Sequence, residues 1–213
     1  MNNSNMRRTR VRDLTYISFS TVLIILSAWI KIPFVIPFTL QTFGIAFAVI
    51  LLGGKRAFIS IILYIILGAI GLPVFSGFTG GIGILFGSTG GYILGFLFLP
   101  LFAWLFSLSK KALKHSNTIA LFIGQLLCYI LGTVWYLLLY ADSFTLYTLL
   151  SIVSICVLPF ILPDAAKLLL AHIVANKLKK YIKYKDDYSS FYFISLKLRF
   201  VCRRTIIYNF TRN

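Results

Sequence analysis

The sequence predicts an all-α membrane protein with six transmembrane helices and a Gly-rich outer loop between the third and the fourth. First, 59% of the 213 residues are hydrophobic and only 12% are charged, with a mean hydropathy of +0.91. A soluble domain carries about 25% charged residues. Second, the 21 Lys and Arg residues cluster at the two ends of the chain and at the edges of apolar runs. This placement is typical of membrane topology rather than of a nucleic-acid-binding surface, so we expect a lipid bilayer and no nucleic acid as partner.

Six apolar segments account for the predicted spans. A helix needs about 20 largely apolar residues to cross the hydrocarbon layer. The segments are Leu14–Ile30, Phe38–Leu52, Ala57–Leu72, Gly90–Leu108, Thr118–Tyr140 and Phe160–Asn176. The first follows four Arg residues, as a signal peptide would, but it has no small-x-small cleavage site, so we expect it to remain as a span. The second and third are short, so tilt, bilayer thinning or burial against neighbours must help them.

The distribution of Lys and Arg predicts the orientation. If the amino terminus is cytoplasmic, 19 of the 21 basic residues fall on the cytoplasmic side, with Lys31 outside and Lys167 within a span. The positive-inside rule therefore predicts six crossings with both termini in the cytoplasm. Residues 1–183 would form the membrane domain, and residues 184–213 a basic and aromatic tail without an assigned role.

Two prolines interrupt the apolar stretch that precedes the tail. Because proline lacks a backbone donor and clashes with the preceding helical turn, Pro159 and Pro163 predict a break in the helix. We expect a short outer-surface helix, then the break, and then a last span that begins near Pro163.

The Gly-rich loop runs from Gly71 to Tyr92. Seven of the 15 glycines of the chain lie between Gly77 and Gly91. Glycine permits close backbone approach, so such a loop can fold over a small ligand. A flexible connector is the alternative, although apolar residues such as Phe75 would be costly to leave in water. No strand precedes the Gly-x-Gly pattern and no Lys-Ser/Thr follows it, so dinucleotide- and phosphate-binding loops gain no support.

Asp164 and Lys167 are ionisable residues inside a predicted span, where an unpartnered charge is expensive. Their spacing of three residues places them on one face of a helix. A capped helix with a local ion pair is the alternative, but it does not explain a Lys one turn deeper in apolar sequence. A Lys there would suit a ligand carboxylate. The Asp could orient the ammonium group of the Lys or accept a hydrogen bond from a ligand N–H, so we favour ligand binding. Gln41 and Tyr92 are uncharged polar candidates at the outer ends of two other spans.

The sequence gives little support to an enzyme, a metal site or a bound cofactor. The chain has no Glu, and Cys128, Cys156 and Cys202 share no metal-like spacing. It has no Gly-x-Ser-Gly nucleophile and no nucleotide-binding motif. The energy for any active transport would therefore come from another polypeptide.

Five blocks, in order, resemble the biotin transporter family BioY. They are Ile32–Thr42, Leu51–Arg56, Leu63–Phe75, Gly87–Phe96 and Pro159–Lys167, and the resemblance extends from about Arg12 to Lys180. Two positions depart from the family pattern. Ser88 stands where the family usually has Pro, and Leu162-Pro163 stands where Pro-Gly often precedes the motif Asp.

This resemblance implies the substrate-binding S component of an energy-coupling factor (ECF) transporter in a bacterial cell membrane. Such a protein is a six-helix bundle that captures biotin from outside, and it works with a transmembrane coupling protein and a pair of cytoplasmic ATPase subunits. Biotin would be the transported ligand rather than a cofactor. The implied ligand-binding residues are Gln41, Thr79, Gly80, Gly81, Gly90, Gly91, Tyr92, Asp164 and Lys167, and the apolar Phe75 of the Gly-rich loop is a further candidate. An S component for a related small vitamin and a non-transporting membrane assembly protein remain as alternatives.

Overall fold

The computed structural model describes residues 3–33, 36–108, 116–140 and 145–180. The predicted tail, residues 184–213, lies outside the described residues. The chain divides into two compact units, Met1–Ala175 and Asn176–Asn213. In the second, residues 176–180 are helical.

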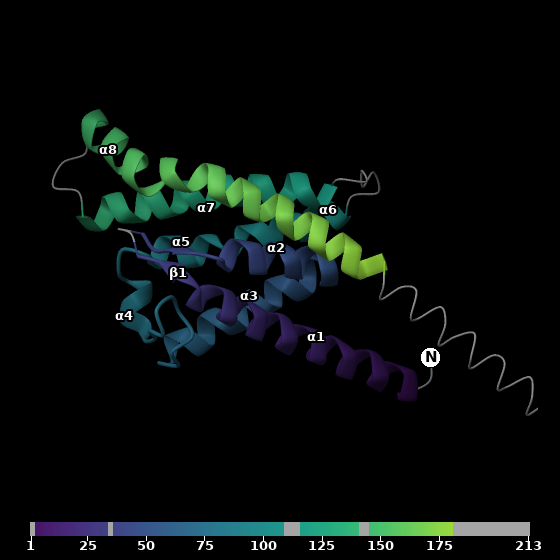
Figure 1. Ribbon diagram of the computed structural model, residues 1–213. Coiled ribbons are helices and arrows are strands. Elements are labelled where there is room, and N and C mark those ends of the chain that lie inside the picture. Colours follow the sequence, from purple (N-terminus) through teal and green to yellow (C-terminus); the bar gives the residue numbers. More distant parts are fainter. Residues whose placement is uncertain (1–2, 34–35, 109–115, 141–144, 181–213) are drawn as a thin grey trace, which may run out of the picture. The chain divides into compact units, whose positions relative to one another are not determined.

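The first unit is built from helices and one small hairpin (Figure 1). In chain order the elements are α1 (Asn3–Trp29), β1 (Lys31–Ile32), β2 (Phe38–Thr39), α2 (Gln41–Leu52), α3 (Gly54–Ala69), α4 (Ile82–Leu85), α5 (Gly90–Gly95), α6 (Phe98–Leu108), α7 (Ser116–Tyr140) and α8 (Leu146–Cys156). A last helix follows α8 and occupies residues 158–175 of this unit. The two strands pair antiparallel, with Lys31 opposite Thr39.

Within the described residues, four segments are long and apolar enough to cross a membrane. They are Val11–Trp29, Gly90–Leu108, Asn117–Tyr140 and Tyr147–Lys180, and they overlap the first, fourth, fifth and sixth predicted spans. The second predicted span corresponds to α2, which has 12 residues, and the third to α3, which has 16. The chain is therefore a helical membrane protein, and the count of six crossings stays a prediction.

The break before the last helix lies earlier than we predicted. The structure has its turn at Val157, and the helix begins at residue 158. Pro159 thus falls in the first helical turn, where a backbone donor has no intrahelical acceptor and its loss costs little. The prediction that the last helix begins near Pro163 was wrong, because the first of the two prolines already satisfies the requirement of a helix start.

Hydroxyl side chains and glycines let the helices pack closely. The hydroxyls of Ser20 on α1 and Ser60 on α3 share a hydrogen bond, and Thr21 Oγ1 donates to the Ser60 carbonyl over 3.3 Å. At Gly124 of α7, a Cβ atom would come within 2.6 Å of the Leu99 Cα on α6. Such bonds and small residues hold helices together in lipid, where hydrophobic burial between helices contributes little.

The Gly-rich segment, residues 70–89, is folded against neighbouring elements. Trp29 Nε1 of α1 donates to the Pro73 carbonyl over 3.0 Å. The Gly81 amide donates to the Gly68 carbonyl at the end of α3 over 2.7 Å. The segment also contains the short helix α4 and a backbone bridge between Phe75 and Thr79. These contacts give it a defined conformation, which a flexible connector does not need.

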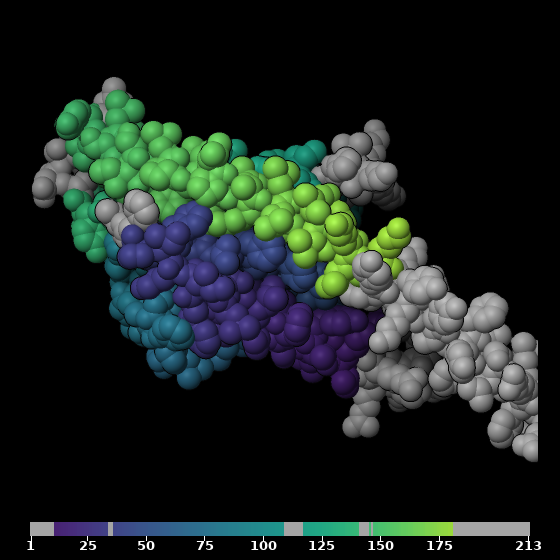
Figure 2. Space-filling model, in the orientation of Figure 1, coloured from purple at the N-terminus to yellow at the C-terminus, as the bar shows by residue number. Residues whose placement is uncertain are grey.

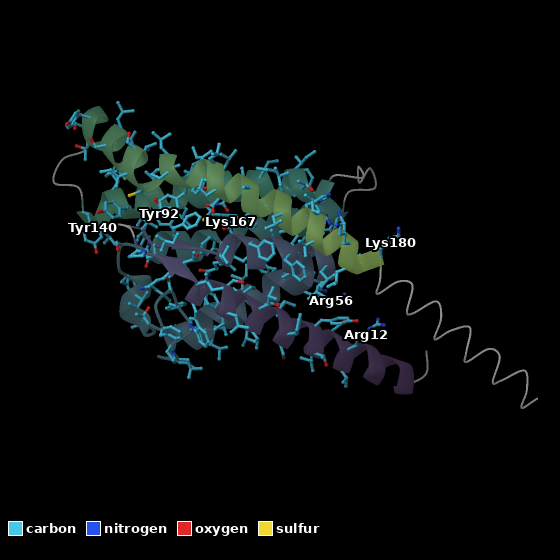
Figure 3. All side chains as sticks on the ribbon, viewed as in Figure 1. Arg12, Arg56, Tyr92, Tyr140, Lys167 and Lys180 are labelled. Carbon is cyan, nitrogen blue, oxygen red and sulfur yellow. The ribbon has the colours of Figure 1, made fainter. Side chains whose placement is uncertain are left out.

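The hairpin with α4 and the start of α1 lie at opposite ends of the first unit (Figure 1). Figure 3 places Tyr140 at the first of these ends and Arg12 and Arg56 at the second. Arg56 is paired there with Asp13, with 2.7 Å between Nη2 and Oδ1.

Candidate ligand-binding site

A cavity of about 190 Å³ lies among the hairpin, the Gly-rich segment and helices α2, α3, α5, α7 and α8 with the last helix. Its lining is mainly apolar and aromatic, with a smaller group of polar side chains. The polar lining residues are Thr39, Gln41, Thr42, Ser76, Thr79, Thr89, Gln125, Asp164 and Lys167; the others are Ile36, Pro37, Tyr64, Phe75, Ile84, Tyr92, Ile93, Phe96, Cys128, Tyr129, Cys156 and Phe160. This mixture is the usual composition of a small-molecule pocket.

Asp164 occupies the centre of a hydrogen-bond network at this cavity. Its Oδ1 accepts from Thr42 Oγ1 at 3.1 Å and from Lys167 Nζ at 2.8 Å. Its Oδ2 accepts from Tyr129 OH at 2.7 Å and from Gln125 Nε2 at 3.1 Å. Four donors from three helices therefore converge on one buried carboxylate, which is how a protein stabilises a charge away from water.

Lys167 also directs its donors at protein groups. Its Nζ donates to the Thr39 carbonyl at 2.6 Å, to Asp164 Oδ1 at 2.8 Å and to Thr42 Oγ1 at 3.5 Å. The same nitrogen lies 3.5 Å from the centroid of the Phe38 ring, which adds a cation–π contact. An ammonium group has three N–H donors, and two of them make short hydrogen bonds to protein acceptors here.

Local sequence explains how these groups meet. Strand β2 ends at Thr39 and α2 begins two residues later at Gln41, so the Thr39 carbonyl and the Thr42 hydroxyl lie close together at this turn. The last helix carries Asp164 and Lys167 on one face toward that turn. The Phe38 and Phe160 rings, 5.9 Å apart between centroids, pack the hairpin against the helix. Figure 2 shows the dark blue residues of the hairpin region in direct contact with the green surface of the last helix.

Five buried polar atoms have no hydrogen-bond partner of normal geometry in the described part of the chain, and all five belong to residues that line the cavity. They are Gln41 Nε2, Tyr64 OH, Ser76 Oγ, Tyr92 OH and Gln125 Oε1. The Tyr64 hydroxyl faces the Gln41 amide and the Tyr92 hydroxyl faces Thr133, but neither pair has bonding geometry. Buried groups left in this state are costly, so a ligand that supplies partners gains affinity.

The structure brings six of the ten predicted site residues to the cavity wall: Gln41, Phe75, Thr79, Tyr92, Asp164 and Lys167. The four predicted glycines are not among the lining residues. A Cβ atom at Gly80 would meet the Leu72 carbonyl at 2.2 Å, and one at Gly91 would meet the Trp135 Cβ at 2.3 Å. Gly90 likewise packs on the Leu85 backbone, and Gly81 has a φ of +104°. These glycines serve the conformation of the segment that carries the lining residues.

Sequence reasoning missed three residues of this network, Thr42, Gln125 and Tyr129, and the cavity-lining residue Tyr64. Gln125 could have been predicted, because a side-chain amide in the middle of a predicted span is as unusual as the amide of Gln41, which we did predict. Tyr129 lies four residues later on the same helix face. A search for pairs of polar residues at helical spacing inside spans would have found both.

Residues 1–184 of the chain match the BioY family. The chain belongs to the BioY family. Among its BioY relatives, the "Probable biotin transporter BioY" of Pyrococcus horikoshii is 38% identical over 144 residues, which cover 68% of this chain and 81% of the relative. The "Biotin transporter BioY" of Thermotoga maritima is 34% identical over 171 residues, which cover 80% of this chain and 97% of the relative.

A solved structure is also similar to this BioY chain. It is the crystal structure of the S-component for biotin from an ECF-type ABC transporter, with 30% identity and a TM-score of 0.69, over 84% of this chain and 95% of that chain. The resemblance seen in the sequence is thus confirmed, together with the S-component fold. Membership of a transporter family also confirms the prediction that the chain is not an enzyme.

Proposed function

We propose that this BioY-family protein is the biotin-binding substrate-capture subunit, or S component, of an ATP-driven ECF uptake transporter. The observation that carries the proposal is that Gln41, Thr79, Tyr92, Asp164 and Lys167, which lie in four separate segments, all line one cavity. These are positions that the BioY motifs assign to the ligand, and the relatives and the solved structure are named for biotin.

The chemistry of the cavity suits biotin, a neutral bicyclic urea with a valerate tail. Phe75, Phe96 and Phe160 offer an aromatic wall for the fused rings and the aliphatic part of the tail. The unpartnered Gln41 Nε2 and Tyr64 OH can donate to oxygen atoms of the ligand. Apolar contact thus provides most of the binding surface, and the polar atoms fix the orientation of the ligand.

We further propose six crossings of the cell membrane, with both termini in the cytoplasm and residues 1–183 as the membrane domain. Support comes from Arg12 and Arg56, which lie at the end of the first unit opposite the hairpin and α4. The Gly-rich segment would then face outside, where its residues Phe75, Ser76 and Thr79 cover the cavity. Because the sequence has no nucleotide-binding motif, an ECF coupling protein and ATPase subunits would supply the energy.

Equilibrium binding of radiolabelled biotin to the detergent-purified full-length chain tests the proposal. Asp164→Asn and Lys167→Ala should each lower the affinity by at least about tenfold, because each leaves buried partners unpaired. Asp13→Asn breaks an ion pair at the opposite end of the unit and is the matched control, expected to bind like the wild type.

Three results would count against the proposal in different ways. Biotin binding that survives in both cavity variants would contradict the site. A wild-type chain that binds another small vitamin in place of biotin would contradict the ligand. A folded wild-type chain that binds no vitamin would favour a membrane assembly role.

A further inference from the structure

The two polar atoms of the Gln125 side chain are in different situations. Its Nε2 donates to Asp164 Oδ2 at 3.1 Å. Its Oε1 is buried and lacks a partner among the residues that the structure describes. The whole residue is 5% exposed and lines the cavity from the middle of α7.

Asp164 dictates the orientation of this amide. An ionised carboxylate can only accept hydrogen bonds, so it draws the NH₂ group of Gln125 and turns the carbonyl oxygen away. Tyr129 OH donates to the same Oδ2 at 2.7 Å and limits how the carboxylate can move. Lys167 holds the other oxygen at 2.8 Å. The charged pair therefore fixes Gln125 with its acceptor unpaired.

We propose that Gln125 Oε1 accepts a hydrogen bond from a ureido N–H of biotin, and that Gln125 is a specificity-determining residue of the capture site. This inference rests on the proposed function. Of the three polar parts of biotin, only the ureido group has N–H donors. The carboxylate would face Oε1 with its own acceptor atoms, and the thioether has no hydrogen to donate.

This assignment also changes the expected role of Lys167. Its Nζ donates to the Thr39 carbonyl and to Asp164 Oδ1 within 2.8 Å and lies 3.5 Å from Thr42 Oγ1, so protein groups rather than a ligand carboxylate hold the ammonium group. Lys167 and Asp164 are then positioning residues that hold the amide of Gln125. The ureido end of biotin lies toward α7, and the valerate tail extends away from it.

A thermodynamic cycle that combines a substitution of Gln125 with methylation of a ureido nitrogen of biotin tests this hydrogen bond. Biotin and two analogues, each methylated at one of the two ureido nitrogens, are bound to the purified full-length wild type and to Gln125→Met, an unbranched replacement of similar length with no amide acceptor. In the wild type, methylation at the nitrogen that faces Gln125 should lower the affinity by about 10- to 100-fold, since it leaves Oε1 unpaired. In Gln125→Met this penalty should shrink by about tenfold, while the penalty at the other nitrogen stays the same.

Tyr129→Phe is the matched control. It removes a donor from the same Asp164 oxygen but leaves Gln125 Oε1 in place. The preference for biotin over both analogues should therefore persist in Tyr129→Phe. Loss of the preference there as well would assign the effect to Asp164 and overturn the role of Gln125.

The remaining outcomes separate this inference from the proposed function. If Gln125→Met binds biotin and keeps the full penalty for methylation at both nitrogens, the inference fails and biotin capture stands. If the wild type does not bind biotin, the proposed function fails first. Should Gln125→Met not fold, Gln125→Asn replaces it: its shorter amide cannot reach the ligand, so it must show the same reduced penalty, and an unchanged penalty overturns the inference.

Discussion

Neutralising both members of the Asp164–Lys167 pair should destabilise the protein no more than neutralising one of them. Nζ and Oδ1 are 2.8 Å apart, and each side chain is 8% exposed. At an effective dielectric constant of about 20, two charges at this distance attract by about 6 kcal/mol. Removing both charges from water costs a similar amount, so the intact pair contributes little net stability. Removing one charge leaves the cost of burying the other uncompensated.

We therefore expect Lys167→Met and Asp164→Asn each to lower the free energy of unfolding by about 3 kcal/mol, at the lower end of values for broken buried pairs. The double variant should lose no more than about 3 kcal/mol, the cost of one substitution alone, so the coupling energy between the two positions should be at least about 3 kcal/mol.

Thermal unfolding of the detergent-solubilised chain, followed by the fluorescence of its three Trp residues, measures these effects. For a chain of this size, 3 kcal/mol corresponds to a fall in Tm of about 6–12 °C. The Asp13–Arg56 pair is the control, because its side chains are 45% and 35% exposed. Asp13→Asn and Arg56→Gln should each cost less than about 1 kcal/mol. If the two cavity substitutions lower Tm additively, the charges do not depend on each other and the reasoning is refuted.

Three further predictions concern the cavity and the segment above it. Gly132→Ala on α7 would place a Cβ atom within 2.4 Å of the Tyr92 ring, so overpacking should lower biotin affinity by about tenfold in the binding assay; an unchanged affinity would mean that Tyr92 has room to move. Trp29→Phe removes a donor to a carbonyl of the Gly-rich segment and should raise the rate of biotin release by about two- to tenfold in a chase with unlabelled biotin, whereas an equal rate would show that this bond does not retain the ligand. Saturating biotin should slow the alkylation of Cys128 and Cys156 by iodoacetamide, because both thiols line the cavity; mass spectrometry measures the rates, and equal rates with and without biotin would place the ligand elsewhere.

Membrane residence and the charged pair could be predicted from local sequence. Whether a segment suits lipid depends on the hydropathy of about 20 consecutive residues, so four predicted spans overlap the long apolar helices of the structure. The spacing of Asp164 and Lys167 depends only on helix geometry, and they lie within 2.8 Å of each other. Gln41, Thr79 and Tyr92, which the family motifs predicted as ligand-binding residues, line the same cavity as the pair.

Packing between distant segments decided the rest. The start of the last helix depended on which of two prolines lay in its first turn, and both fit the local rule. Gln125 and Tyr129 reach Asp164 across 39 and 35 residues of sequence. The hydrogen bond of 2.6 Å from Lys167 goes to the backbone carbonyl of Thr39, 128 residues away. Every residue has such a carbonyl, so no residue type can signal that contact. Only the folded arrangement of α2, α7 and the last helix determines which carbonyls and amides face the buried charges.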